Sequence, residues 1–191
     1  MKIVFGGAFN PVTHAHIEVY KYVMSKIDAS EFIFLPVSNA YTKSELESNF
    51  NRKNMLELAT KEYINTSISD LELEDSDYLG TYQSLIRLSD KYNEEIAFVV
   101  GADNLFQMHK WINIHGILSE FKVVILGRNE INIKKLVKDD VVLNKHLNSF
   151  IIFEDFDLNI SSTKFRETFD KVLVDNEVYE YIIKNKLYRG E

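Results

Sequence analysis

The residue types best suited to chemistry gather near the start of the chain, in the segment Gly6–His16. This segment follows a short apolar run, Ile3–Phe5, and leads into a stretch with helical periodicity. It therefore brings two glycines, the hydroxyl of Thr13 and the imidazole of His16 to the expected N-terminus of a helix. Backbone N–H groups and the helix dipole make such an end a binding site for anions such as phosphates.

The spacing of these polar residues limits what they can bind. Thr13 and His16 are three residues apart, so on a helix they share a face and can both donate to one phosphate. His14 and His16 are two apart, so they point to different sides and cannot chelate one metal ion. A histidine at a helix start is more often a surface or capping residue. The adjacent glycines and the following helix favour the phosphate-binding interpretation here.

A second hydroxyl cluster lies far downstream, in the segment Ile160–Arg166. Ser161 and Ser162 open a predicted helix, and Arg166 follows about one turn later. This segment by itself is typical of an ordinary serine-capped helix. Two such helix starts in one chain indicate an enzyme that handles nucleotides.

Short apolar runs alternate with segments of helical period along the chain. The expected strands are Lys2–Phe5, Glu31–Pro36, Ser67–Glu72, Glu95–Gly101, Lys122–Gly127 and Ser149–Glu154. The expected helices are His14–Ile27, Arg52–Tyr63, Thr81–Tyr92, Asn113–Glu120 and Asn176–Tyr188. This alternation predicts an α/β fold: a Rossmann-like, three-layer parallel sheet with helices on both faces, in a single domain over residues 1–191. Ligands in such folds bind beyond the carboxyl ends of the strands, where both the opening segment and Gly101–Asp103 are expected.

Composition excludes several classes of protein. The net charge of −7 argues against a nucleic-acid partner. No apolar run is long enough to span a membrane, and no cysteine is available for a disulfide, a thiolate metal site or a nucleophile. We therefore expect a cytoplasmic protein without a dedicated metal site. The sequence leaves open whether it forms a homo-oligomer.

The opening segment resembles the signature of the nucleotidyltransferase family, G-x-F-x-P followed by H/T-x-G-H. The matching residues are Gly7, Phe9, Pro11, Thr13 and His16. Two residues depart from it: Ala15 replaces the usual glycine, and Asn10 replaces the commoner aspartate. The downstream segment is similar to the family's I-S-S-T-x-x-R. The resemblance implies a nucleotidyltransferase fold and binding of ATP with Mg²⁺.

Further segments resemble the bacterial nicotinate mononucleotide adenylyltransferases within this family. Gly101–Asp103 followed by Trp111 is similar to that branch's G-A-D…W, and Thr81–Leu85 is a loose version of its Y-T-x-D-T-L. Lys43 falls where the branch has a lysine after the second strand. The resemblance implies adenylyl transfer from ATP to nicotinate mononucleotide, a step of NAD biosynthesis.

The resemblance also implies a role for each matching residue. Catalysis is expected of His16, Thr13 and Arg166. ATP binding is expected of Gly7, Ala8, Phe9, Asp103, Ile160, Ser161, Ser162 and Arg166. Mononucleotide binding is expected of Lys43, Thr81 and Trp111. Two alternatives stay open: a pantetheine-phosphate adenylyltransferase, and a nucleotide sensor without catalytic activity on the same fold.

Overall fold

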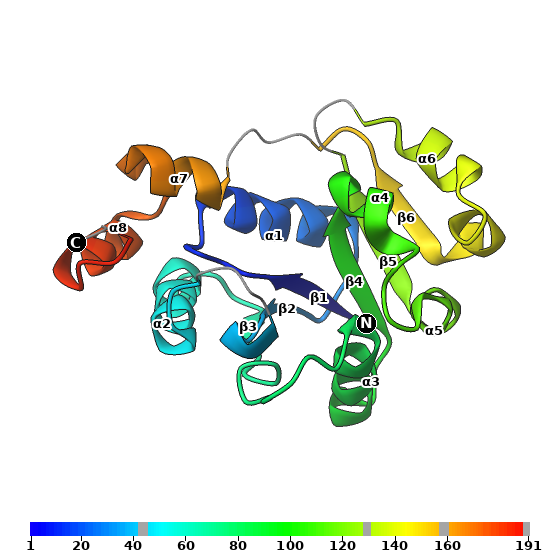
Figure 1. Ribbon diagram of the computed structural model, residues 1–191, viewed down its shortest axis with the longest axis horizontal. Helices are drawn as coiled ribbons and strands as arrows, with labels where there is room; N and C mark the ends of the chain where they lie inside the picture. Colours follow the sequence, from blue (N-terminus) through cyan, green and yellow to red (C-terminus); the bar gives the residue numbers. More distant parts are fainter. Residues whose placement is uncertain (42–45, 128–130, 157–160, 189–191) are drawn as a thin grey trace. The chain divides into compact units, whose positions relative to one another are not determined.

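The computed structural model describes residues 1–41, 46–127, 131–156 and 161–188 (Figure 1). Within them, six strands form one sheet in the order β3-β2-β1-β4-β5-β6. The strands are β1 (Lys2–Gly7), β2 (Glu31–Pro36), β3 (Thr66–Ile68), β4 (Ile96–Gly101), β5 (Lys122–Leu126) and β6 (Phe150–Phe153). The pairs β1–β4, β2–β3, β4–β5 and β5–β6 are parallel. The predicted α/β fold with a parallel sheet is thereby confirmed.

Helices connect these strands, as the alternating pattern predicts. They are α1 (His14–Lys26), α2 (Asn49–Thr60), α3 (Thr81–Tyr92), α4 (Leu105–Met108), α5 (Ile114–Glu120), α6 (Ile133–Asp139), α7 (Ser162–Thr168) and α8 (Asn176–Lys184). Short 3₁₀ turns are η1 (Asn39–Tyr41), η2 (Ala102–Asn104), η3 (Leu143–Ser149) and η4 (Lys171–Leu173). Among the described residues, no helix is long and apolar enough to cross a membrane.

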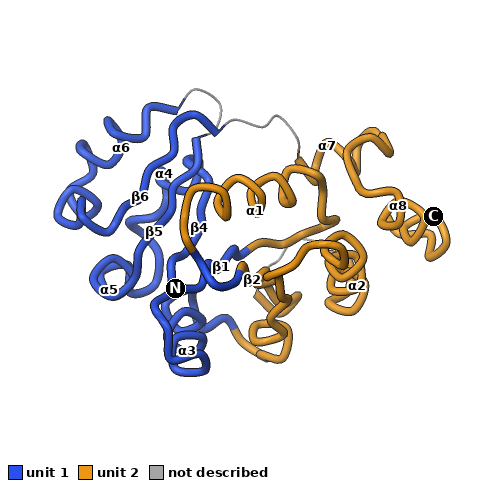
Figure 2. The backbone as a smooth tube through the Cα atoms, turned by 180° about the vertical axis from the view of Figure 1, so that it is seen from behind, with its two compact units in different colours: residues 1–6, 29–31, 78–158 blue, residues 7–28, 32–77, 159–191 orange. Residues whose placement is uncertain are grey.

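The chain divides into two compact units (Figure 2). Unit 1 comprises Met1–Gly6, Ala29–Glu31 and Tyr78–Leu158. Unit 2 comprises Gly7–Asp28, Phe32–Asp77 and Asn159–Glu191. The prediction of a single domain over residues 1–191 stays a prediction.

The core of unit 1 is built on β4 and β5. Every residue of Ile96–Val100 and of Val123–Leu126 is buried, as expected of central parallel strands that are covered on both faces. β1 pairs with β4 in the register Val4 to Phe98. From β1 the chain adds β2 and β3 on one side of the sheet, and from β4 it adds β5 and β6 on the other. The carboxyl ends of β1 and β4 therefore form the switch point at which such folds bind ligands.

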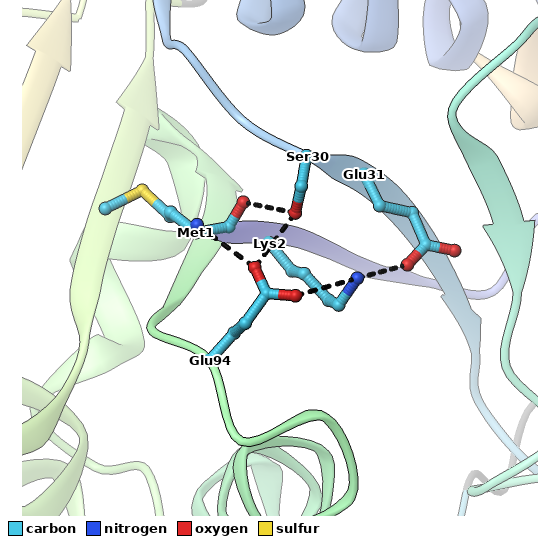
Figure 3. Close-up of polar contacts among 5 residues, drawn as sticks. All are labelled: Met1, Lys2, Ser30, Glu31 and Glu94. Atoms are coloured by element: carbon cyan, nitrogen blue, oxygen red, sulfur yellow. Dashed lines mark hydrogen bonds and ion pairs between the residues drawn. The ribbon is translucent and has the colours of Figure 1, made fainter.

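A polar cluster ties together the amino ends of the strands in unit 1 (Figure 3). Lys2 Nζ lies 2.8 Å from Glu31 Oε2 and 3.3 Å from Glu94 Oε1. Ser30 Oγ donates to Glu94 Oε2 at 3.0 Å, and the α-amino group of Met1 lies 3.2 Å from the same oxygen. Each charge in this cluster therefore has an opposite charge beside it.

The core of unit 2 is rich in aromatic side chains on and around β2. The rings of Phe32 and Phe34 lie 5.0 Å apart between centroids, and Tyr20 of α1 contacts Phe32 edge-on at 5.4 Å. α2 packs beside α8, where Tyr181 donates to Asn51 Oδ1 at 2.7 Å. These contacts place the start of α2 firmly within the unit.

Most predicted elements differ from the structure by at most two residues at an end, and three differ by more. The strand predicted over Ser67–Glu72 spans only Thr66–Ile68, because the hydroxyl of Ser69 accepts from the Leu71 amide and turns the chain. The helix predicted over Arg52–Tyr63 begins earlier, because Ser48 caps it by accepting from the Asn51 amide.

The third difference is at the C-terminal helix, which was predicted over Asn176–Tyr188 and ends at Lys184. Lys186 adopts a positive φ of 54°, and the Leu187 amide donates to the carbonyl of Ile182 at 3.0 Å. This bond to a carbonyl five residues back is typical of a helix C-terminus.

Candidate active site

The loop after β1 is shaped by the close approach of Phe9 to Gly7. A Cβ atom on Gly7 would lie 3.0 Å from the Phe9 ring, so a larger residue there would displace the ring. Phe9 is 1% exposed and has a positive φ of 46°. Its ring contacts His16 edge-on, with centroids 5.1 Å apart. The predicted ATP-binding pair Gly7 and Phe9 thus positions the imidazole.

The backbone also fixes which nitrogen of His16 carries the proton. The Thr13 N–H donates to His16 Nδ1 at 2.9 Å, and Thr13 Oγ1 lies 2.9 Å from the same nitrogen. Because a backbone N–H can only donate, Nδ1 must be the acceptor and the neutral ring carries its proton on Nε2. His16 can therefore donate a hydrogen bond through Nε2.

The two distant polar segments meet within unit 2. Ser162 Oγ donates to the carbonyl of Pro11 at 2.8 Å, and Arg166 Nη1 donates to the carbonyl of Asn10 at 2.5 Å. Arg166 Nη2 also donates to Thr163 Oγ1 at 3.2 Å, and Ser161 caps α7 by accepting from the Lys164 amide. The start of α7 is thus joined to the loop that leads into α1.

Asn10 connects this loop to two further segments. Its side-chain oxygen accepts from the Tyr188 hydroxyl at 3.0 Å and from the Glu47 amide at 3.1 Å. Asn10 is 4% exposed. Burial also raises the pKa of Tyr188, so its hydroxyl remains a donor at neutral pH. An uncharged acceptor satisfies both donors, which gives Asn10 a structural role at the position where the signature has aspartate.

Arg52 of α2 holds the same loop from the protein interior. Arg52 is 0% exposed, and its Nη1 donates to the carbonyl of Ala8 at 2.7 Å. The sequence places Arg52 in a predicted helix, and nothing in the helical pattern indicates that a charged residue would be buried there. Its contacts depend on where the tertiary structure places neighbouring carbonyl groups.

Three of the predicted site residues lie in unit 1. Asp103 is exposed on η2, directly after β4, and a Cβ atom on Gly101 would lie 2.6 Å from its Oδ1. The half-buried Trp111 packs its indole edge-on against Phe98, with centroids 6.2 Å apart. Thr81 opens α3.

The segments that contain Thr81 and Trp111 are neighbours in unit 1. Gly80, which precedes α3, has a φ of 85°, and a Cβ atom there would lie 3.1 Å from Cβ of Ile112. The residues next to Thr81 and Trp111 are thus in close contact. Two of the three residues predicted to bind the mononucleotide therefore belong to one small region.

Two predicted site residues, Lys43 and Ile160, lie outside the described residues. Among those described, no three His, Asp or Glu side chains gather as they would around a metal ion.

Residues 4–168 match the cytidylyltransferase-like family. A protein of Clostridium acetobutylicum named "Probable nicotinate-nucleotide adenylyltransferase" is 30% identical, over 98% of both chains. A protein of Acholeplasma laidlawii with the same name is 31% identical, over 98% of this chain and 97% of the relative. These matches confirm the predicted family resemblance.

A solved structure has the same fold. It is nicotinic acid mononucleotide adenylyltransferase of Plasmodium falciparum complexed with APC, with a TM-score of 0.75 and 19% sequence identity. The match covers 98% of this chain and 96% of the other. It confirms the predicted Rossmann-like nucleotidyltransferase architecture.

Proposed function

Because the chain belongs to the cytidylyltransferase-like family, we propose that it transfers the adenylyl group of ATP to nicotinate mononucleotide. An oxygen of the mononucleotide 5′-phosphate forms a bond to the α-phosphorus of ATP. The bond from that phosphorus to the bridging oxygen of the β-phosphate breaks. The products are deamido-NAD and pyrophosphate, and the reaction is a step of NAD biosynthesis.

The chemistry makes few demands on the protein. A phosphate monoester has a second pKa of about 6, so it is mostly dianionic at neutral pH and needs no general base. The protein must align the two phosphates and offset the charge that develops on the leaving pyrophosphate. Hydrogen-bond donors and cations suffice for this, and the start of α1 and the contacting helix α7 together supply both.

The observation that supports this proposal most is that Ser162 and Arg166 of α7 contact the loop that leads to Thr13 and His16 at the start of α1. The proton on Nε2 makes His16 a donor to the α- and β-phosphates, and the Thr13 side chain lies beside it. Arg166 and Ser162 already contact the carbonyls of Asn10 and Pro11, and we assign them, with Ser161, to the β/γ end of ATP.

The remaining assignments follow the family resemblance. Gly7, Ala8, Phe9 and Ile160 line the ATP, and Asp103 binds its ribose. Lys43 holds the acceptor phosphate, while Thr81 and Trp111 hold the pyridine ring. Mg²⁺ would be brought by ATP and would supply charge neutralisation.

Names of relatives and solved structures support nicotinate mononucleotide as the acceptor. The full-length relatives carry the name "Probable nicotinate-nucleotide adenylyltransferase", and one matching structure is described as complexed with NaAD. We infer that this chain acts in the cytoplasm.

The test is pyrophosphate release from ATP and Mg²⁺ with nicotinate mononucleotide, nicotinamide mononucleotide and phosphopantetheine compared side by side. We expect the nicotinate substrate to react fastest. Preference for phosphopantetheine would refute the assigned acceptor. Binding of ATP without pyrophosphate release with any acceptor would indicate a sensor, and Ala15→Gly would then test whether the motif glycine restores turnover.

A further inference from the structure

Among the described residues of unit 2, Arg52 is the most completely buried charged residue, and the proposed reaction itself does not use it. Its Nε donates to the carbonyl of Glu47 at 2.9 Å and its Nη1 to the carbonyl of Ala8 at 2.7 Å. Its Nη2 has three acceptors: the carbonyl of Val37 at 2.6 Å and the side-chain oxygens of Asn39 and Asn49, both at 2.8 Å. One guanidinium thus joins three segments of the chain.

All of these acceptors are uncharged. Glu47 contributes its main-chain oxygen, whereas its carboxylate accepts from the Ser48 amide and the Asn51 side chain. Among the described residues, Arg52 has no carboxylate within the distance of an ion pair. Burial lowers its pKa, but an arginine remains protonated at neutral pH.

The Glu47 carboxylate lies close enough to raise the pKa of Arg52, but burial outweighs this effect. A buried charge whose hydrogen-bond acceptors are all neutral costs folding free energy. The anionic triphosphate of ATP, bound at the adjacent loop, would offset that charge. A buried arginine of this kind is therefore better suited to a protein that binds a polyanion than to one that binds no anion.

The contact with Ala8 also sets the direction of a neighbouring donor. In a planar trans peptide the C=O and N–H point to opposite sides. The Ala8 carbonyl points at the Arg52 guanidinium in the interior. The N–H of Phe9, in the same peptide unit, therefore points away from the guanidinium.

We propose that Arg52 is a positioning residue for ATP, which orients the Ala8–Phe9 peptide toward the phosphates and adds a positive charge that is hydrogen-bonded only to neutral acceptors. This inference rests on the proposed function for the identity of the anion. Arg52 does not touch the reacting atoms. Its effect is expected on the affinity for phosphates and only secondarily on the chemical step.

The test measures nucleotide binding in Arg52→Gln and Arg52→Lys. Calorimetry with ATP and Mg²⁺, and competition by AMP, are performed well below the melting temperature of each variant. Leu56→Val is the matched control, because Leu56 is buried in the same helix and its substitution destabilises the fold while keeping the Arg52 side chain. We expect Arg52→Gln to weaken ATP binding at least about tenfold and AMP binding much less.

Arg52→Lys should lie between wild type and Arg52→Gln, because an ammonium keeps the charge but has three donors in place of five. If Arg52→Gln does not fold, the ATP affinity of Arg52→Lys alone tests the proposal. Wild-type ATP affinity in folded Arg52→Lys or Arg52→Gln would overturn the proposal. The proposal would also be overturned if the affinities for ATP and AMP fell equally, or if Leu56→Val lowered the affinity for ATP as much as Arg52→Gln.

These binding measurements need no acceptor, so they are independent of turnover. Wild-type protein that binds ATP but releases no pyrophosphate would refute the proposed function and leave the role of Arg52 testable.

Discussion

Two polar clusters of this protein use their positive charges differently. At the amino ends of the strands in unit 1, Lys2 lies between the carboxylates of Glu31 and Glu94. In unit 2, Arg52 and Arg166 donate to main-chain carbonyls and to uncharged side chains. The first cluster is electrically balanced, whereas the arginines of the second have no carboxylate in contact among the described residues.

The comparison separates charges that serve the fold from charges that are suited to a ligand. The ion pairs of Lys2 are partly buried, and their opposite charges largely cancel for any approaching molecule. A cation that is hydrogen-bonded only to neutral acceptors still produces a positive electrostatic potential, which attracts a triphosphate. We therefore expect changes in the first cluster to alter only stability and changes in the second to alter nucleotide binding and turnover.

The largest effect is expected from His16→Ala. Loss of the Nε2 donor should lower kcat about 100- to 1000-fold, because a single preorganised donor at developing charge has this magnitude. The measurement is pyrophosphate release at saturating ATP and acceptor. His14→Ala, which changes a neighbouring histidine of the same helix, should keep near-normal kcat. Equal losses in both variants would contradict the assigned donor.

Arg166→Ala should come next, by weakening the grip on the β/γ end of ATP. A charge-assisted hydrogen bond contributes about 1.5–3 kcal/mol, so KM for ATP should rise roughly 10- to 100-fold. Lys164→Ala removes an exposed cation from the same helix and should change KM little. An unchanged KM in Arg166→Ala would show that its contact with the Asn10 carbonyl serves the fold alone.

Ser162→Ala should have a smaller effect, because it removes one neutral hydrogen bond to the Pro11 carbonyl. We expect kcat/KM for ATP to fall about two- to tenfold. Thr168→Ala, which removes a hydroxyl at the other end of α7, provides the comparison. A loss in Thr168→Ala as large as in Ser162→Ala would indicate general destabilisation of α7.

Glu94→Gln should leave turnover unchanged and alter only the pH dependence of stability. Hydrogen bonds from Ser30, then from the terminal amine and Lys2, lower the pKa of Glu94 below its ordinary value of 4.5. A carboxyl with a depressed pKa stabilises the fold above its unfolded-state pKa, and that contribution is lost as pH falls through the folded-state pKa.

The measurement for this cluster is thermal unfolding at pH 7 and at low pH. Wild type should melt at a higher temperature than Glu94→Gln at pH 7, and the difference should shrink as the pH falls below 4.5. Glu95→Gln changes the next carboxylate in the chain and should match wild type. A difference for Glu94→Gln that persists at low pH would contradict this account of its charge.

The sequence predicted the architecture well where hydrophobic periodicity was strong. The bounds of Glu31–Pro36 and Thr81–Tyr92 agree with β2 and α3. A buried apolar run marks β2, and Gly80 and Asn93, both with a positive φ, flank α3. The bounds of β3, α2 and α8 were wrong, because side-chain caps and a positive φ determine where those elements end.

The candidate site was predictable in its residue types but not in its contacts. Serines and an arginine in a recognisable order identified α7, yet no pattern indicates that Ser162 and Arg166 bond to the carbonyls of Pro11 and Asn10. Such contacts depend on the tertiary positions of backbone atoms. The burial of Arg52 was hidden for the same reason, since an isolated arginine in a helix normally faces solvent.

The central claim is that the hydrogen-bond donors at the starts of α1 and α7 promote adenylyl transfer. It is tested most directly by quantifying both products from ATP, Mg²⁺ and nicotinate mononucleotide, with ATP affinity measured in parallel for wild type and His16→Ala. The account predicts equal amounts of deamido-NAD and pyrophosphate from wild type, and a large loss of both in His16→Ala with ATP binding retained. Wild type that binds ATP and forms neither product would contradict it.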